Sequence, residues 1–242
     1  MSFYKNKQNH TIAYKSLKGR GLGIIFIHGL NSDMNGAKAL TVERYARKNN
    51  LNFIRFDCRG HGKSEGKFED FTISDWKRDL LDVIDNIAKG PQILIGSSMG
   101  GWLMMLAAKA RPKRIKGMIG LAAAPDFGKD LYNGLNKKNK REINSKGITK
   151  YSSYGFSYYL TKKFFIEAEK NRVLQKPFRF TKPLILIHGL KDKVVNEDIP
   201  RKILKKVTGK NVNIIYLKES DHRLSSEIDL KIIKKSIEYI KN

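Results

Sequence analysis

A serine set between two glycines favours nucleophilic chemistry in this chain. Residues 96–100 are Gly-Ser-Ser-Met-Gly, which fits the pattern G-x-S-x-G with Ser98 at its centre. In this pattern the serine occupies a sharp turn between a strand and a helix, and the two glycines leave room for the turn. An apolar run precedes Ser98 and a helix-like stretch follows it, so we expect its hydroxyl to be exposed as a nucleophile. The alternative is an ordinary glycine-lined turn.

A serine hydroxyl is a weak nucleophile at neutral pH, so it needs a general base, and that base needs an acid to orient it. His222 and Asp192 each follow a predicted strand, which places both at the carboxyl edge of a sheet, where ligands bind in such folds. Asp126 is a competing acid after another strand, and Asp221 is less favoured because it adjoins His222. The chain order Ser98, Asp192, His222 favours Asp192. An exposed loop histidine and a turn-forming aspartate are the alternatives.

Acyl transfer also needs donors for a developing oxyanion, and backbone amides can supply them. The residue after the nucleophile, Met99, is expected to give one amide, and Leu30, which follows the first buried strand, the other. His28 is expected to be structural. His61 and His188 are interpreted as loop histidines without assigned chemistry.

The elements that must position these residues alternate between apolar runs and stretches of helical spacing. We predict strands within 2–17, before Ser98, and at 23–27, 51–56, 115–123, 184–188 and 212–217. We predict helices after Ser98 and at 36–48, 73–88, 197–207 and 226–240. This alternation indicates an α/β fold with a mostly parallel sheet and helices on both faces.

The alternation is interrupted between residues 127 and 180, which are rich in Lys, Asn, Tyr and Phe. We interpret residues 1–242 as one domain and 127–180 as a small helical cap inserted over the site, with helices near 136–144 and 157–173. Aromatic side chains of the cap could line an acyl site or simply pack within it. They are Tyr154, Phe156, Tyr158, Tyr159, Phe164 and Phe165.

Composition limits the class of protein. The chain has 242 residues, 40% hydrophobic and 29% charged, as expected for a soluble globular domain. Its net charge of +25 is spread along the chain and no nucleic-acid-binding motif accompanies it, so we predict no specific nucleic-acid partner. The single Cys58, and the lack of a signal peptide or transmembrane run, favour the cytoplasm, or the mitochondrial matrix if a presequence has been removed. The oligomeric state is not predicted.

Two other kinds of site are not favoured. Gly62-Lys63-Ser64 has the ending of a phosphate-binding P-loop, but Asp57 stands where that motif requires its first glycine. The histidines are scattered at strand ends and lack metal-ligand spacing. We therefore predict neither a P-loop phosphate site nor a metal.

Taken together, these motifs resemble the α/β-hydrolase family along nearly the whole chain. They are Phe-Ile-His-Gly-Leu at 26–30, Asp-x-Arg-Gly-His-Gly-x-Ser at 57–64, the turn around Ser98, Asp192 and His222. Residues 34–40, 90–104 and 220–223 are similar to the branch of mitochondrial palmitoyl-protein thioesterases and acyl-glucuronide esterases. The resemblance implies an α/β-hydrolase fold and hydrolysis of esters or thioesters, on small molecules or acylated proteins, through an acyl-enzyme and without a cofactor.

Two alternatives remain open at this point. The same scaffold also supports hydrolysis of C–C or peptide bonds. A basic binding protein that keeps the fold without catalysis is an alternative from a different class, with its positive charge contacting an anionic partner.

Overall fold

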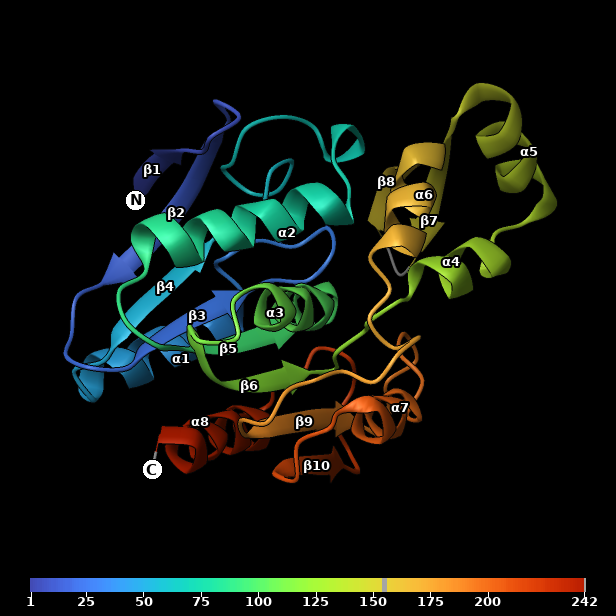
Figure 1. Ribbon diagram of the computed structural model, residues 1–242. Helices are drawn as coiled ribbons and strands as arrows, with labels where there is room; N and C mark the ends of the chain where they lie inside the picture. The colour runs from blue at the N-terminus through green and yellow to red at the C-terminus, as the bar shows by residue number, and fades with distance from the viewer. Residues whose placement is uncertain (154–155, 242) are drawn as a thin grey trace.

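The computed structural model describes residues 1–153 and 156–241, apart from the side chains of Ser153 and Phe156. Within these residues, eight strands form one sheet in the order β1-β2-β4-β3-β5-β6-β9-β10 (Figure 1). The strands are β1 (Ser2–Lys5), β2 (Thr11–Leu17), β3 (Gly23–Ile27), β4 (Asn52–Phe56), β5 (Gln92–Ser97), β6 (Ile115–Leu121), β9 (Leu184–Gly189) and β10 (Val212–Leu217). Strand β2 pairs antiparallel with both β1 and β4, and all other pairings in this sheet are parallel, which confirms the predicted mostly parallel sheet.

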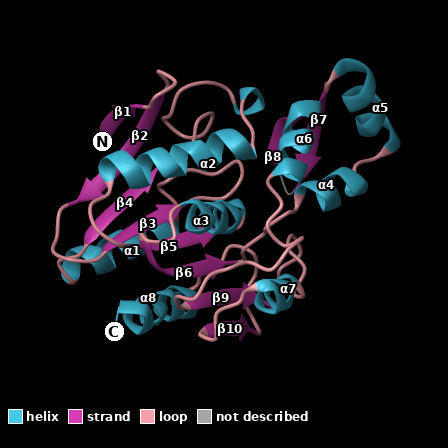
Figure 2. Ribbon diagram, in the orientation of Figure 1, coloured by secondary structure: helices cyan, strands magenta, loops and turns pink. Residues whose placement is uncertain are grey.

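The central strands are buried on both faces, because helices cover both sides of the sheet. Every residue of β3, β5 and β9 is buried, as their uninterrupted apolar runs predict. One core contains α2 (Ile73–Asp82), α3 (Met99–Ala110) and α7 (Ile199–Lys206), and the core of the opposite face contains α1 (Ala37–Lys48) and α8 (Glu227–Lys241) (Figure 2). Helix α2 continues into a π-helical turn at Val83–Ile87. The fold is the predicted α/β-hydrolase fold.

The chain leaves the sheet after β6 and returns at β9. The intervening segment contains α4 (Gly128–Gly134), α5 (Lys137–Lys146), β7 (Ile148–Ser153), β8 (Phe156–Thr161) and α6 (Lys162–Lys170). It lies beyond the arrowheads of β5, β6 and β9 in Figure 1. It is attached to α2 through Ser74, whose hydroxyl donates to Glu167 at 2.6 Å and accepts from Asn171 at 2.7 Å.

The predicted helix at 157–173 is wrong in its first part. Residues up to Thr161 form β8, which pairs antiparallel with β7, placing Tyr158 opposite Tyr151. Leu160 is buried while Tyr159 is exposed, which is the alternation of a strand. The helix begins only at Lys162, because the Thr161 hydroxyl accepts from the amide of Phe164 and caps it.

Candidate active site

Ser98 occupies the sharp turn that the sequence predicts between β5 and α3. Its backbone has φ 52° and ψ −114°, a conformation that costs a non-glycine residue on the order of 1–3 kcal/mol. The surrounding packing holds this turn. A Cβ atom added at Gly96 would lie 2.3 Å from the Gly100 carbonyl oxygen, and one added at Gly100 would lie 2.2 Å from that of Ile27. Both glycines are therefore required by close backbone approaches, and Ser98 is partly exposed at the tip of the turn.

The structure brings Asp192 and His222 into direct contact. The Nδ1 atom of His222 lies 2.8 Å from Oδ2 of Asp192. The other carboxylate oxygen, Oδ1, accepts from the amides of Val194 at 2.8 Å and Val195 at 2.9 Å. The Asp192 side chain is 0% exposed and that of His222 is 24% exposed. A buried carboxylate thus fixes one nitrogen of an imidazole that is itself partly exposed.

The ionised form of Asp192 is favoured in this position. Burial alone would raise the pKa of the carboxyl group, but the hydrogen bonds from His222, Val195 and Val194 outweigh burial and hold this pKa below its ordinary value. Asp192 can therefore orient His222 and balance the positive charge that the imidazole acquires when it takes a proton.

Backbone hydrogen bonds align the loops that carry the three side chains at one edge of the sheet. The Ser98 amide donates to the Leu121 carbonyl at the end of β6, and the Ala122 amide donates to Ile187 in β9. The loop with Asp192 is joined to β10 by the bond from Leu190 to Leu217. Because β5, β6, β9 and β10 are parallel neighbours, their carboxyl ends bring Ser98, Asp192 and His222 to the same edge.

The loop after β3 packs against the candidate nucleophile. A Cβ atom added at Gly29 would lie 3.4 Å from Cβ of Ser98. His28 holds this loop, because its Nδ1 atom lies 2.7 Å from the Gly29 carbonyl and its Nε2 accepts from the Cys58 amide at 3.0 Å. Its structural role is therefore the one expected. The Asn31 amide in turn donates to His61.

Two amides at this edge carry no internal hydrogen bond. Within the described residues, neither the Leu30 amide nor the Met99 amide donates to a protein acceptor. Leu30 lies in the loop fixed by His28, and Met99 is the first residue of α3, where the positive end of the helix dipole favours negative charge. Neither of the two amides expected to serve as oxyanion donors is therefore occupied by an acceptor from the described part of the chain.

The competing acid Asp126 has a different role. Its carboxylate accepts from the amides of Val173 and Leu174 at 2.8 and 2.9 Å, and Arg172 lies 3.9 Å away. These bonds attach the end of the inserted segment to the end of β6. In the described part of the chain, Asp126 makes no hydrogen bond to a histidine.

Interpreting His61 and His188 as loop histidines without a role is only partly right. His61 lies in a loop but is buried, and burial, together with the neighbouring His28, lowers its pKa to about 3. His188 belongs to β9 rather than to a loop, is 0% exposed, and its Nε2 atom lies 3.8 Å from Asp192. Burial lowers the pKa of His188, so this ring packs beneath Asp192 as a neutral group.

Two residues near the site were not singled out from the sequence. The Lys38 ammonium donates to the carbonyl of Arg223, the residue after His222, and so ties α1 to the loop of the candidate base. Phe68 lies in a 3₁₀ turn (Phe68–Asp70), with its ring 5.3 Å from His61 and 5.2 Å from Tyr158. Lys38 belongs to the motif 34–40, but that motif does not reveal its partner 185 positions away.

The aromatic residues of the inserted segment divide between packing and exposure. Phe164 is 2% exposed and contacts Trp76 and Phe127, so it belongs to the core that joins the segment to the sheet. Tyr158 packs edge-on against Phe68, whereas Tyr159 is exposed. Phe165 packs edge-on against Tyr132 and Phe164. Tyr154 and the side chain of Phe156 lie outside the described residues.

The described residues contain neither a metal-ligand cluster nor a membrane-spanning helix. Residues 1–153 and 156–241 contain no cluster of three His, Cys, Asp or Glu side chains arranged to hold a metal ion. No helix in the same ranges combines the length and apolar character needed to cross a membrane.

Comparison with known proteins identifies the family of this chain. Residues 22–148, more than half of the chain, match the family model Hydrolase_4, described as serine aminopeptidase, S33. Palmitoyl-protein thioesterase ABHD10, mitochondrial, from Homo sapiens is 39% identical over 242 residues, which is 98% of this chain and 79% of the relative. The orthologue from Mus musculus is 38% identical over 237 residues, 96% of this chain and 80% of the relative.

Solved structures give the same result. Alpha/beta hydrolase domain-containing protein 10 from mouse superposes with a TM-score of 0.91 at 37% identity, covering 99% of this chain and 97% of that structure. Est1E from Butyrivibrio proteoclasticus, bound to ferulic acid, superposes with a TM-score of 0.84 at 21% identity over 100% and 98% of the two chains, which shows the shared fold. The chain belongs to the α/β-hydrolase family, is similar to its mitochondrial palmitoyl-protein thioesterases, and is an enzyme of the esterase and thioesterase class.

Proposed function

We propose that this protein hydrolyses carboxylic esters or thioesters through an acyl-enzyme formed on Ser98. The observation that carries the proposal is the contact between His222 Nδ1 and Asp192 Oδ2, 2.8 Å long, at the sheet edge where Ser98 stands on a strained turn. Strain of this kind persists where the surrounding structure enforces it for function. The similarity to palmitoyl-protein thioesterases supports a thioester or ester as the substrate.

The proposed reaction has two steps. His222 Nε2 takes the hydroxyl proton as Ser98 Oγ bonds to the acyl carbon, and the protonated His222 then gives this proton to the departing alcohol or thiol. A water molecule, deprotonated by His222, next attacks the acyl-enzyme, and Ser98 regains its proton as the acid leaves. Asp192 keeps the histidine proton on Nδ1 throughout and is not itself protonated.

The amides of Leu30 and Met99 are proposed to donate to the oxyanion in both steps. A donor in a well-formed oxyanion hole contributes on the order of 3–4 kcal/mol to transition-state stability. Hydrogen bonds from Cys58 to His28 and from Asn31 to His61 hold the loop before and after Leu30. This support makes the Leu30 amide a preorganised donor.

We propose that residues 127–180 act as the cap of the site and that the acyl chain packs against its inner aromatic side. Phe68 and Tyr158 form a pair at 5.2 Å between the cap and the loop after β4, and His61 connects this pair to His28. An aromatic surface that begins beside the Leu30 loop suits an apolar acyl group. Replacing both residues by Ala should raise KM for long acyl chains more than for acetyl esters.

A fluorophosphonate probe tests the nucleophile directly. It should label the wild-type protein and leave Ser98→Ala unlabelled, while Ser97→Ala, a matched change one residue earlier in the same turn, should still be labelled. Labelling of Ser98→Ala would exclude Ser98 as the nucleophile. A panel of p-nitrophenyl esters and acyl thioesters of graded length then measures the preference for ester or thioester and for chain length.

Peptide-bond hydrolysis is the second candidate, because the matching family model is described as serine aminopeptidase. Aminoacyl p-nitroanilides should be cleaved far more slowly than the corresponding esters if the esterase proposal holds. The curated relatives are named as mitochondrial proteins, so of the two predicted locations we favour the mitochondrial matrix over the cytoplasm. Fractionation of cells that express the native gene tests this choice.

A further inference from the structure

Asp192 has a second histidine beside it in addition to His222. The Nε2 atom of His188 lies 3.8 Å from Oδ2 of Asp192, the same oxygen that His222 Nδ1 contacts at 2.8 Å. His188 belongs to β9, its side chain is 0% exposed, and no step of the proposed reaction uses it. It is therefore a buried ionisable group next to the proposed acid that the reaction leaves without a role.

The contacts of His188 determine which of its nitrogens carries the proton. Its Nε2 atom lies 3.1 Å from the carbonyl oxygen of Val195, and a carbonyl oxygen can only accept, so Nε2 must be the donor. The other tautomer would direct a lone pair toward both this carbonyl and the Asp192 carboxylate. Burial lowers the pKa of His188, which keeps the ring neutral. The His188 proton is thus directed to Val195, and Oδ2 of Asp192 is left for His222.

Val195 connects His188 to the Asp192 carboxylate. Its carbonyl accepts from His188, and its amide donates to Oδ1 of Asp192 at 2.9 Å. The Val194 amide donates to the same oxygen at 2.8 Å, and Val195 itself is buried. Because one residue makes both contacts, a shift of Val195 would move a donor that orients the carboxylate.

Packing alone does not account for a histidine at position 188. Its Nδ1 atom is buried and has no hydrogen-bond partner among the described residues, which costs stability because the atom loses its bonds to water. An apolar side chain of similar size would avoid this cost, but it would leave the Val195 carbonyl without the donor at Nε2. The donor at Nε2 is therefore what distinguishes histidine from an apolar residue here.

We propose that His188 is a positioning residue of the esterase site, which donates from Nε2 to Val195 and so holds the Asp192 carboxylate in line with His222. This role rests on the function proposed for Asp192 and His222, and it adds a residue that does not touch the substrate. The contacts run from β9 through His188 and Val195 to Asp192, so a buried central strand orients the carboxylate. Precise orientation of such groups has a large effect on rate.

The first test removes the donor and then replaces it. His188→Leu should lower kcat for a p-nitrophenyl ester roughly tenfold with little change in KM. His188→Gln, whose amide nitrogen can occupy nearly the position of Nε2, should restore most of this loss. Tyr216→Phe is the matched control, because the Tyr216 hydroxyl also donates to a carbonyl of this loop, that of Glu197 at 3.0 Å, and should keep kcat close to that of the wild type. Unchanged kcat in His188→Leu, or an equal loss in Tyr216→Phe, would overturn the proposal.

The second test separates positioning from a general loss of stability. The rate of fluorophosphonate labelling is compared in the wild type, His188→Leu, Asp192→Asn and the double variant, and labelled protein accumulates with time even at low reactivity. His188→Leu should slow labelling roughly tenfold in the wild-type background but by less than about twofold in Asp192→Asn, because the carboxylate that it positions is then absent. An equal factor in both backgrounds would show a role independent of Asp192 and overturn the proposal.

The third measurement does not require turnover. Asp192 holds the proton of neutral His222 on Nδ1, so displacement of the carboxylate should convert part of the protein to the Nε2–H tautomer, which ¹⁵N NMR of the ring detects. We expect this change in His188→Leu but not in His188→Gln or Tyr216→Phe. An unchanged tautomer in His188→Leu would overturn the positioning role. A wild type without ester hydrolysis, with the tautomer change present in His188→Leu, would refute the proposed function and still support the effect of His188 on Asp192.

Discussion

Replacing Asp192 by Asn is expected to lower kcat roughly 10⁴-fold while leaving the fold intact. The two oxygens of this carboxylate have different partners in the structure. Oδ1 accepts from the amides of Val194 and Val195, and Oδ2 lies 2.8 Å from Nδ1 of His222. An Asn side chain keeps the shape but has only one acceptor oxygen.

The turn amides determine how the Asn side chain would be oriented. Two donors at Val194 and Val195 require the carboxamide oxygen in the place of Oδ1, so the NH₂ group must face His222. Nδ1 can then form a hydrogen bond only as an acceptor, which moves the imidazole proton to Nε2. That nitrogen is the proposed acceptor of the Ser98 proton, so the base is in the wrong tautomer. The loss of 10⁴ known for this change in serine protease triads corresponds to about 5.4 kcal/mol of activation free energy.

The assay is the steady-state hydrolysis of a p-nitrophenyl ester, together with ¹⁵N NMR of the His222 ring to identify the tautomer. Asp126→Asn is the matched control, because the Asp126 carboxylate also accepts from two backbone amides but forms no hydrogen bond with a histidine within the described residues. The Asp126→Asn variant should keep kcat within about tenfold of the wild type, because the carboxamide oxygen can still accept hydrogen bonds from these amides. An active Asp192→Asn enzyme with an unchanged tautomer, or a greater loss in Asp126→Asn, would refute this reasoning.

Three further predictions follow from single contacts. Gly100→Ala places a Cβ atom 2.2 Å from the Ile27 carbonyl oxygen, so urea unfolding should show a free energy of unfolding lower by roughly 2 kcal/mol or more. Gly36→Ala is the control, because a Cβ atom there would have no atom within 4 Å and should change this free energy little. Equal losses in the two variants would contradict the packing argument. The pKa of His61 is lowered to about 3 in the folded protein, so below about pH 6.5 the unfolded state binds more protons than the folded state. Protonation of this histidine should therefore lower the free energy of unfolding by about 2 kcal/mol as the pH falls from about 7 to about 5. A His61→Phe variant with the same pH dependence as wild type would contradict it. Lys38→Met removes the donor to the carbonyl of Arg223, beside His222, and should lower kcat roughly tenfold with little change in KM. Restored activity in Lys38→Arg would support a positioning role for this lysine. Unchanged kcat in Lys38→Met would exclude that role.

The parts of the fold that depend on local pattern could be predicted from the sequence. Continuous apolar runs such as 23–27 and 184–188 occur where a strand is buried on both faces, and the structure has β3 and β9 there. The turn at Ser98 follows from two glycines at fixed spacing. The candidate acid and base each follow a predicted strand. Because the carboxyl ends of parallel strands meet at one edge of a sheet, both residues are expected at that edge.

What could not be predicted depends on contacts between distant residues. The hairpin of β7 and β8 was expected to be partly helical, because Tyr158, Tyr159 and Leu160 form a short apolar run that suits a helix or a strand. Pairing with β7 selects the strand over the helix, and the residues of this run do not themselves indicate which segment they will pair with. The same holds for Lys38 and Arg223, whose contact depends on how α1 lies against the loop before α8.

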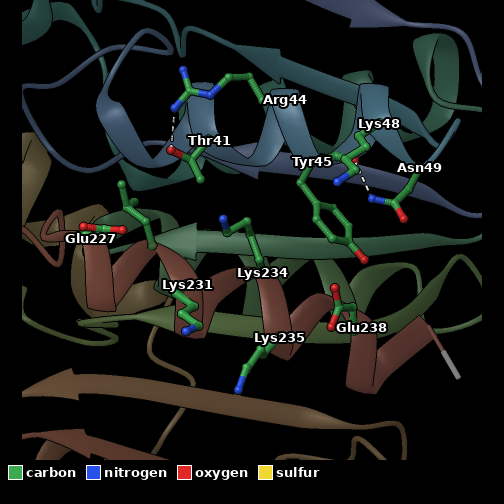
Figure 3. Close-up of a pocket in the computed structure, with 11 residues that line it drawn as sticks. Thr41, Arg44, Tyr45, Lys48, Asn49, Glu227, Lys231, Lys234, Lys235 and Glu238 are labelled. Carbon is green, nitrogen blue, oxygen red and sulfur yellow. Dashed lines mark hydrogen bonds between the residues drawn. The ribbon is translucent and has the colours of Figure 1, made fainter.

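Charge illustrates the same limit. The net charge of +25 does not indicate a binding surface when the lysines are dispersed along the sequence, because a general compositional bias would explain this charge equally well. Folding changes this, because α1 and α8 lie far apart in the sequence but pack side by side, so that cations from residues 44–48 and 231–235 surround one groove. The packing of α1 against α8 (Figure 3) therefore determines where positive charge gathers on the folded protein, and the sequence pattern does not predict this packing.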